Sequence, residues 1–145
     1  MLVRDYMTTK VTTLPDDSRL LDAALIIRRS GKRHVPIVNS TGTVVGMVSD
    51  RDVSRVAPSM LSKMTPEEYN QIFESTPISV VMSTNVISIS PNDDVSLAAS
   101  LLYTKKIGAL PVVEDGKLVG IVTGTDMLAL LNELLGKPAE SPASD

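Results

Sequence analysis

The sequence predicts a mixed α/β (α+β) chain of two β-α-β-β-α repeats that pack with pseudo-two-fold symmetry. Two observations predict this fold. Residues 46–52, GMVSDRD, return as residues 120–126, GIVTGTD. Residues 35–38, VPIV, return 75 positions later as 110–113, LPVV. Repetition at a nearly fixed spacing sets the architecture, because copies of one supersecondary unit bury their apolar faces against each other. We therefore expect two related ligand clefts at the seam between the repeats.

Each repeat starts with a strand, a turn and a helix. Residues 11–14 and 86–89 mix β-branched and polar side chains, which is typical of a strand. The turns that follow, 15–18 (PDDS) and 91–94 (PNDD), end on residues that accept hydrogen bonds from a helix N-terminus. We expect the helix caps at Asp17 or Ser18 and at Asp93 or Asp94, and we favour this turn and cap role over acid–base chemistry. Apolar residues then recur at helical spacing: Leu20, Ala23, Ala24 and Ile27, and Val95, Ala98, Ala99 and Leu102.

A two-stranded hairpin and a closing helix complete each repeat. Gly31 is expected to end the first helix, because glycine tolerates the left-handed conformation found there. Strands are expected at 35–38 and 44–48, and the Asp-Gly pair at 115–116 predicts a tight hairpin in the second repeat. The closing helices are expected to start near Asp50–Asp52 and Thr125–Asp126.

The repeats leave two further segments. Repeat 1 is assigned to residues 1–57 and repeat 2 to residues 78–135. The linker 58–77 should hold a short helix, since Thr65 can act as N-cap, Pro66 suits the first helical position, and the helix can run through Phe73. The small, polar, proline-rich tail 136–145 is expected to be disordered.

Composition excludes several classes of function. The chain has no cysteine and a single histidine, which excludes thiolate and multi-histidine metal sites. One Phe, three Tyr and no Trp give no platform for stacking nucleic-acid bases, and a net charge of −3 gives no general attraction to nucleic acid. No apolar run approaches the roughly 18 residues of a membrane span, and no signal peptide is evident, so a cytoplasmic protein is expected.

The repeated signature places a hydroxyl and a carboxylate where a strand meets a helix. Ser49 and Asp52 lie three residues apart, and Thr123 and Asp126 repeat the pattern. Amides at a helix start attract phosphate, and a carboxylate accepts hydrogen bonds from the adjacent hydroxyls of a ribose. Thr125 adds a second hydroxyl. The alternative is that each pair only caps its helix, and recurrence of the pattern does not exclude that.

The ordered set of repeated features resembles the CBS (cystathionine-β-synthase) domain, and the tandem pair resembles a Bateman module. These features are Met7, Val11, Pro15 and Ala23, then residues 35–38, then the Gly-x-x-Ser/Thr-x-x-Asp signature, each with a counterpart in repeat 2. The N-terminal VRDYM and the stretch SDRD are similar to small stand-alone proteins related to acetoin-utilisation regulators. The resemblance covers nearly all of the chain outside 58–77 and the tail.

The resemblance implies that an adenine nucleotide (AMP, ADP or ATP) binds as a regulatory ligand in clefts that draw on both repeats. It assigns phosphate and ribose to Ser49, Asp52, Thr123 and Asp126. It assigns the base to residues before and at the strand prolines and to the first strands. These implied residues are Thr12, Lys32, Arg33, His34, Val35 and Pro36, and Ile87, Ile107, Gly108, Ala109, Leu110 and Pro111.

The residues that precede the two prolines differ in charge. Arg33 and His34 stand where repeat 2 has Gly108 and Ala109. Related modules often aim a basic pair from this place at phosphates, while a solvated basic corner is an equally favoured interpretation. If the pair is functional, the two clefts should bind a multiply phosphorylated ligand with unequal affinity.

The sequence is consistent with three functions, which it favours to different degrees. The leading hypothesis is a non-enzymatic sensor whose adenosine-containing ligand changes how it acts on a regulated protein. The second is a dimeric scaffold that binds no ligand. An enzyme is least favoured, because the sequence shows no phosphate-binding glycine loop and no evident nucleophile or base that would act with the lone histidine in catalysis. The resemblance implies a homodimer, for which the sequence offers one apolar face on the closing helix: Leu128, Leu131, Leu134 and Leu135.

Overall fold

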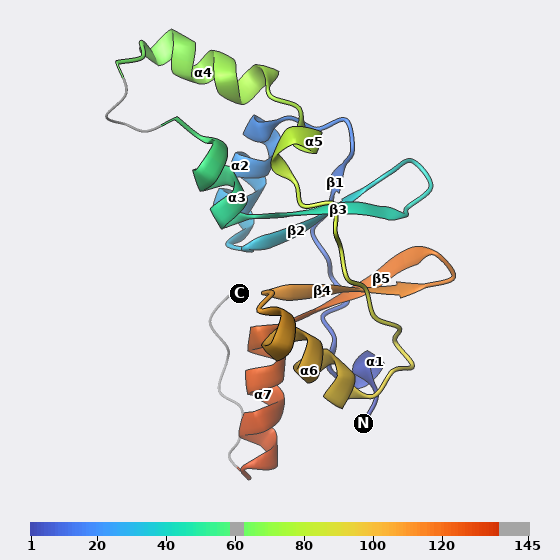
Figure 1. The fold of residues 1–145 in the computed structure, drawn as a ribbon. Coiled ribbons are helices and arrows are strands. Elements are labelled where there is room, and N and C mark those ends of the chain that lie inside the picture. Colours follow the sequence, from blue (N-terminus) through green and yellow to red (C-terminus); the bar gives the residue numbers. More distant parts are fainter. Residues whose placement is uncertain (59–62, 137–145) are drawn as a thin grey trace. The chain divides into compact units, whose positions relative to one another are not determined.

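The computed structural model describes residues 1–58 and 63–136, and it divides the chain into two compact units (Figure 1). Unit 2 comprises residues 12–85. Unit 1 combines residues 1–11 with the chain from residue 86 onward. The leading segment of each sequence repeat therefore belongs to the unit that carries the other repeat's hairpin and helices.

Unit 2 is a three-stranded sheet covered by helices. Strand β1 (Leu14–Pro15) pairs in parallel with β2 (His34–Val38), which pairs antiparallel with β3 (Val44–Ser49). The helices of this unit are α2 (Leu20–Ser30), α3 (Asp50–Val56), α4 (Pro66–Ser75) and α5 (Ile78–Val81). Its core consists of Leu20, Ala23, Ile37, Val48, Ile78 and Val81.

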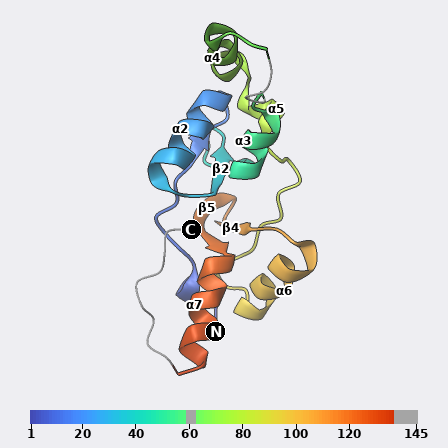
Figure 2. The same cartoon turned by 90° about the vertical axis from the view of Figure 1, so that its left-hand side faces the viewer.

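Unit 1 repeats this plan with a two-stranded sheet. Strands β4 (Ala109–Glu114) and β5 (Lys117–Thr123) form an antiparallel hairpin. The helices are α1 (Val3–Tyr6), α6 (Val95–Lys105) and α7 (Gly124–Leu134), and α1 contacts both of the others. Figure 2 shows α6 beside α7. The core consists of Val3, Ile89, Ala98, Leu110, Val112 and Val122. Four of these six residues align with core residues of unit 2, so the sequence repeat is a repeat of packing.

Several local expectations are confirmed. Gly31 ends α2 in the left-handed conformation (φ 71°), and the linker helix α4 starts at Pro66 behind a Thr65 cap. Asp115 and Gly116 both have positive φ, as the tight turn of the β4–β5 hairpin requires. Asp94 caps α6, where its side chain accepts the Ser96 N–H.

Three local expectations were wrong. The first strand of unit 2 is at Leu14–Pro15 rather than 11–14, and in unit 1 the expected strand 86–89 is reduced to one bridge between Ile89 and Val112. Neither Asp17 nor Ser18 caps α2. The N-cap is Arg19, whose N–H is accepted by Asp22. The expected disorder of the tail falls on residues 137–145, which lie outside the described residues.

The short helices α1 and α5 were not expected from the sequence, and they explain the repeated methionine and glycine. Each is followed by a methionine that lies against a strand glycine, Gly46 in β3 or Gly120 in β5. A Cβ added at Gly46 would lie 2.4 Å from Met82 Sδ. One added at Gly120 would lie 2.6 Å from Met7 Sδ and 3.0 Å from the Thr8 carbonyl oxygen. Glycine is therefore required at both positions, because the methionine approaches too closely to leave room for a Cβ atom.

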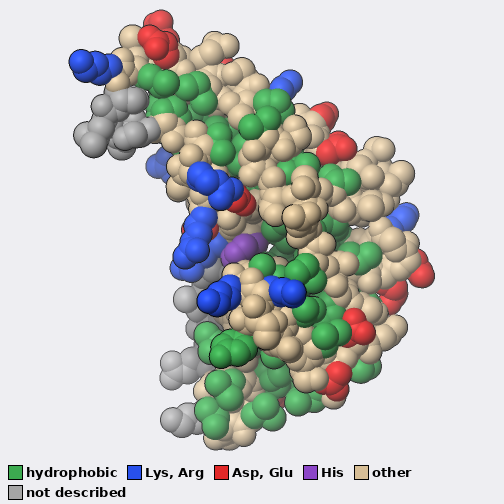
Figure 3. Space-filling model, viewed as in Figure 1, with side chains coloured by type: hydrophobic (Ala, Val, Ile, Leu, Met, Phe, Trp, Pro, Cys, Tyr) green, Lys and Arg blue, Asp and Glu red, His purple; other side chains and the backbone are tan. Residues whose placement is uncertain are grey.

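Large apolar side chains remain exposed on α7. Leu128, Leu131 and Leu134 are 66%, 50% and 63% exposed, and Leu135 beyond the helix end is 67% exposed. In the space-filling view, hydrophobic side chains gather over the region where Figure 1 draws α7 (Figure 3). None of the helices among the described residues combines the length and apolar character needed to cross a membrane.

Candidate functional site

In each unit the hairpin brings the pre-proline segment beside the signature. The register pairs His34 with Ser49 on β2 and β3, and it pairs Ala109 with Thr123 on β4 and β5. In unit 2 the Asp50 N–H also donates to the Arg33 carbonyl at 3.0 Å. Two stretches that are separate in sequence are therefore neighbours at the end of each sheet where a helix begins.

The carboxylate of Asp52 is fixed by the start of α3. Its Oδ2 accepts the Ser49 N–H at 2.8 Å and the Ser49 hydroxyl at 3.0 Å. The Asp52 N–H in turn donates to Ser49 Oγ at 3.2 Å, which completes a capping box. These hydrogen bonds confirm that Ser49 and Asp52 cap α3. The cap uses only the Oδ2 oxygen of Asp52.

Unit 1 reproduces this arrangement on α7. Oδ2 of Asp126 accepts the Thr123 N–H at 2.8 Å and the Thr123 hydroxyl at 3.2 Å. The Asp126 N–H donates to Thr123 Oγ1 at 3.3 Å. Two carboxylates, one in each unit, are therefore held in the same way by their own helix starts, and their second oxygens point away from the cap bonds.

The second oxygens have different partners in the two units. Asp52 Oδ1 accepts from Arg55 Nη2 at 2.5 Å, and the Arg55 side chain is 70% exposed while that of Asp52 is 14% exposed. Asp126 Oδ1 accepts the Thr8 hydroxyl at 3.0 Å. Sequence reasoning missed both partners. Arg55 follows Asp52 by three positions on one helix, a spacing that could have indicated the pair.

The structure divides the predicted site residues between the units. Unit 2 holds Thr12, residues 32–36, Ser49 and Asp52, and unit 1 holds Ile87, residues 107–111, Thr123, Thr125 and Asp126. The expectation that each cleft draws on both repeats stays a prediction. Val35, Pro36, Leu110 and Pro111 are fully buried, and Leu110 belongs to the core of unit 1, so their backbone atoms are what remains for a ligand.

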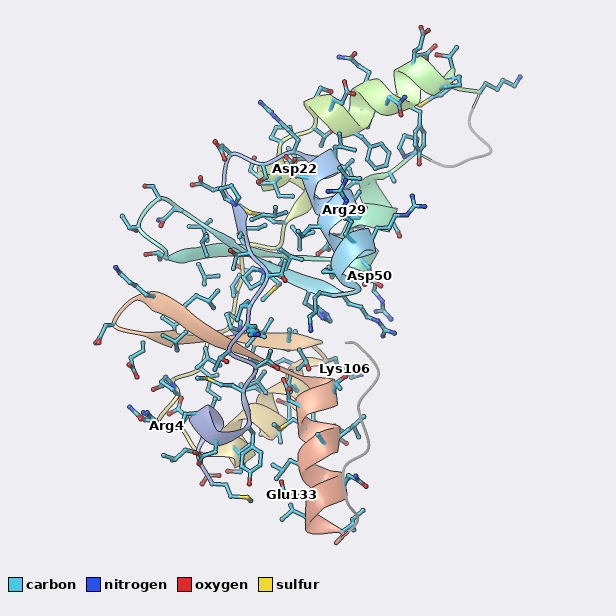
Figure 4. All side chains as sticks on the ribbon, turned by 180° about the vertical axis from the view of Figure 1, so that it is seen from behind. Arg4, Asp22, Arg29, Asp50, Lys106 and Glu133 are labelled. Carbon is cyan, nitrogen blue, oxygen red and sulfur yellow. The ribbon has the colours of Figure 1, made fainter. Side chains whose placement is uncertain are left out.

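Charge differs between the corresponding ends of the two units. Figure 4 labels Arg29 on α2 and Asp50 at the start of α3 in unit 2, and Lys106 beside the start of α7 in unit 1. Lys32, Arg33 and Arg51 of unit 2 align with Ile107, Gly108 and Thr125 of unit 1. The described residues contain no group of three or more His, Cys, Asp or Glu side chains able to hold a metal ion.

Asp94 provides a capping carboxylate outside the signature. It accepts the Ser96 N–H at 2.9 Å at the start of α6. This backbone hydrogen bond from Ser96 lowers the pKa of Asp94 below its usual value, because it stabilises the charged form. Asp94 is therefore a natural reference for the cost of losing a cap alone.

The chain matches the family model for the CBS domain twice, over residues 3–59 and 78–133. It is similar to CBS domain-containing protein YhcV of Bacillus subtilis, with 32% identity over 139 residues, 96% of this chain and 90% of that protein. It is also 36% identical over 120 residues to uncharacterized protein MJ1404 of Methanocaldococcus jannaschii. That match covers 82% of this chain, which spans about a quarter of the relative's length (26%).

Two solved structures share the fold over most of the chain. A putative acetoin utilization protein (AcuB) from Vibrio cholerae has a TM-score of 0.77 and 33% identity, covering 94% of this chain and 93% of its own. The CBS domain pair of protein MJ0100 has a TM-score of 0.76 and 26% identity, covering 92% and 98%. The latter was solved in complex with 5′-methylthioadenosine and S-adenosyl-L-methionine.

Proposed function

The chain belongs to the CBS-domain family as a tandem pair of repeats, and on that premise we propose that it is a regulatory module that binds an adenosine-containing ligand, with AMP, ADP or ATP as the expected class. CBS domain pairs are in general regulatory modules rather than enzymes. The observation that carries the ligand class is the MJ0100 domain pair, whose complex holds two adenosine derivatives.

The signature carboxylates support this proposal chemically. A ribose diol presents two adjacent hydroxyl donors, and an ionised carboxylate is an acceptor-only group. Asp52 and Asp126 are each held in a fixed orientation by a cap that uses Oδ2, so the diol would bind through Oδ1. A preorganised acceptor loses little side-chain entropy on binding, which favours affinity. We assign the sugar to these two acids.

Loss of both signature acids is expected to abolish binding. Asp52→Ala and Asp126→Ala should each lower the affinity of one site for AMP about 10- to 100-fold, because each removes hydrogen bonds to a charged acceptor worth about 1.5–3 kcal/mol. Isothermal titration calorimetry with AMP, ADP and ATP on the full chain measures both sites.

Asp94→Ala is the matched control, since it removes a capping aspartate without touching either signature. It should leave the affinity for AMP unchanged. Absence of binding of all three nucleotides to the unaltered chain would favour the second candidate, a scaffold that binds no ligand. Equal loss in Asp94→Ala and Asp52→Ala would show that the effect is one of helix stability.

Regulation would follow from differential affinity. A ligand shifts an equilibrium between two conformations only by as much as its affinity differs between them. We propose that the bound nucleotide changes the arrangement of the chain and that a regulated protein responds to this change. Arg33 and His34 would give the two clefts unequal affinity for a multiply phosphorylated ligand, because repeat 2 has Gly108 and Ala109 in their place.

We further propose that two copies of the chain associate through α7. The exposed leucines described above favour this, because clustered apolar side chains gain free energy when they leave water. The double variant Leu131→Lys/Leu134→Lys should elute as a monomer where the unaltered chain is a dimer, as measured by size-exclusion chromatography with light scattering. Leu97→Lys, at an exposed site on α6, should stay dimeric. A dimer that survives the double variant would exclude this face.

A further inference from the structure

The two signature acids carry different charge environments at the oxygen that a sugar would use. Oδ1 of Asp52 is engaged by the guanidinium of Arg55 at 2.5 Å, whereas Oδ1 of Asp126 is engaged by the neutral hydroxyl of Thr8 at 3.0 Å. The position that aligns with Arg55 is Ala129, which has no polar side chain. The capping boxes of the two units match, but only unit 2 has an arginine three positions after the signature acid.

This difference changes the energetics of ligand entry. The hydroxyl of Thr8 leaves the negative charge of Asp126 uncompensated. Oδ1 has two lone pairs in both units, so a diol that donates to both of them displaces Thr8 at Asp126 and Arg55 at Asp52. The pair with Arg55 neutralises the charge of Asp52. Because the arginine side chain is 70% exposed, the pair is worth about 0–1 kcal/mol and is displaced at little cost. The displaced guanidinium then lacks an anion.

We infer that Arg55 makes the Asp52 site selective for phosphorylated nucleosides, while the Asp126 site accepts neutral and phosphorylated nucleosides more evenly. The inference rests on the proposed function. A sugar that takes Oδ1 of Asp52 releases Arg55, and a phosphate on the same ligand gives the guanidinium a forked, charge-assisted partner. A neutral nucleoside releases the arginine without replacing its anion, so it competes against the internal pair.

Arg55 differs from the other cations of unit 2 because its guanidinium bonds to the signature acid itself. The neighbouring charges do not decide between the sites. Arg51 and Asp50 have opposite charges, and Lys106 adds a positive charge to unit 1 where unit 2 has Gly31. The selectivity is therefore attributed to the Arg55 contact.

Single-site variants and two probes test the inference. Adenosine and AMP are titrated calorimetrically into the full chain carrying Asp126→Ala, which reports the Asp52 site, or Asp52→Ala, which reports the Asp126 site. The ratio of AMP affinity to adenosine affinity should be at least tenfold larger at the Asp52 site. Adding Arg55→Gln to Asp126→Ala should bring that ratio within about threefold of the value at the Asp126 site. Circular dichroism confirms that each variant is folded.

The reciprocal variant provides the control. Ala129→Arg, added to Asp52→Ala, places an arginine three positions after Asp126 and should raise the AMP preference of that site. A ratio at the Asp52 site that does not change in Arg55→Gln overturns the inference and leaves the proposed function standing. Failure of both probes to bind the unaltered chain overturns both. Loss of AMP binding by Asp52→Ala and Asp126→Ala, with a reduced ratio in Arg55→Gln, supports both.

Discussion

Replacing Leu110 with alanine is expected to lower the free energy of unfolding of unit 1 by about 2–5 kcal/mol. The side chain is fully buried in the core of the unit, against residues that include Val3 and Val122. Truncation removes apolar area from a close-packed site and leaves a cavity, and both terms are unfavourable. Urea denaturation followed by circular dichroism measures the change.

The control for Leu110→Ala is Tyr103→Ala on α6. The Tyr103 side chain is 83% exposed, so its loss should change stability by no more than about 0.5 kcal/mol. A cost as small as that of Tyr103→Ala would contradict the assignment of Leu110 to the core.

The second large effect is expected for Gly120→Ala, which should destabilise unit 1 by about 1–3 kcal/mol. The added Cβ meets a flexible side-chain atom, Met7 Sδ, and also the Thr8 carbonyl oxygen at 3.0 Å. That oxygen belongs to the backbone, and the Thr8 N–H is bonded to the Ile121 carbonyl at 2.9 Å. The backbone must therefore shift, and its hydrogen bonds to β5 weaken.

Gly46→Ala is the matched substitution in unit 2. There the close atoms all belong to the Met82 side chain, the nearest at 2.4 Å. The double variant Gly46→Ala/Met82→Ala should recover part of the loss, while Gly120→Ala/Met7→Ala should recover less, because the Thr8 carbonyl remains. A double-mutant cycle from urea denaturation gives both coupling energies. Equal recovery in the two units would show that the carbonyl contact carries no cost.

The repeat made most of the fold predictable from the sequence. The hairpins, the four longer helices and the capping signature follow from local patterns such as Asp115-Gly116 and Ser49-x-x-Asp52. The helices α1 and α5 do not, because four residues are too few to show a helical period. The first strand of each repeat is also shorter than predicted. Strand formation depends on packing against partner strands more than on the residues of the segment itself.

Part of the candidate site could likewise be predicted from the sequence. The signature acids follow from the repeat, and Arg55 could have been found from helical spacing. The bond between Thr8 and Asp126 joins residues that are 118 positions apart, and it depends on the leading segment packing into the unit of the other repeat. No local pattern carries that information, because such a contact is set by topology.

The divided composition of unit 1 has a consequence for how the chain is made. Unit 2 is one uninterrupted stretch, whereas unit 1 needs residues 1–11 together with the chain from residue 86 onward. Synthesis delivers all of unit 2 before β4, β5 and α7 leave the ribosome. Unit 2 can therefore fold first. The apolar side chain of Val3 on α1 stays exposed to solvent until the rest of unit 1 has been synthesised. The amino-terminal segment therefore packs last, and the Asp126 site is completed only when Thr8 reaches it. Contacts between residues that are far apart in sequence form slowly.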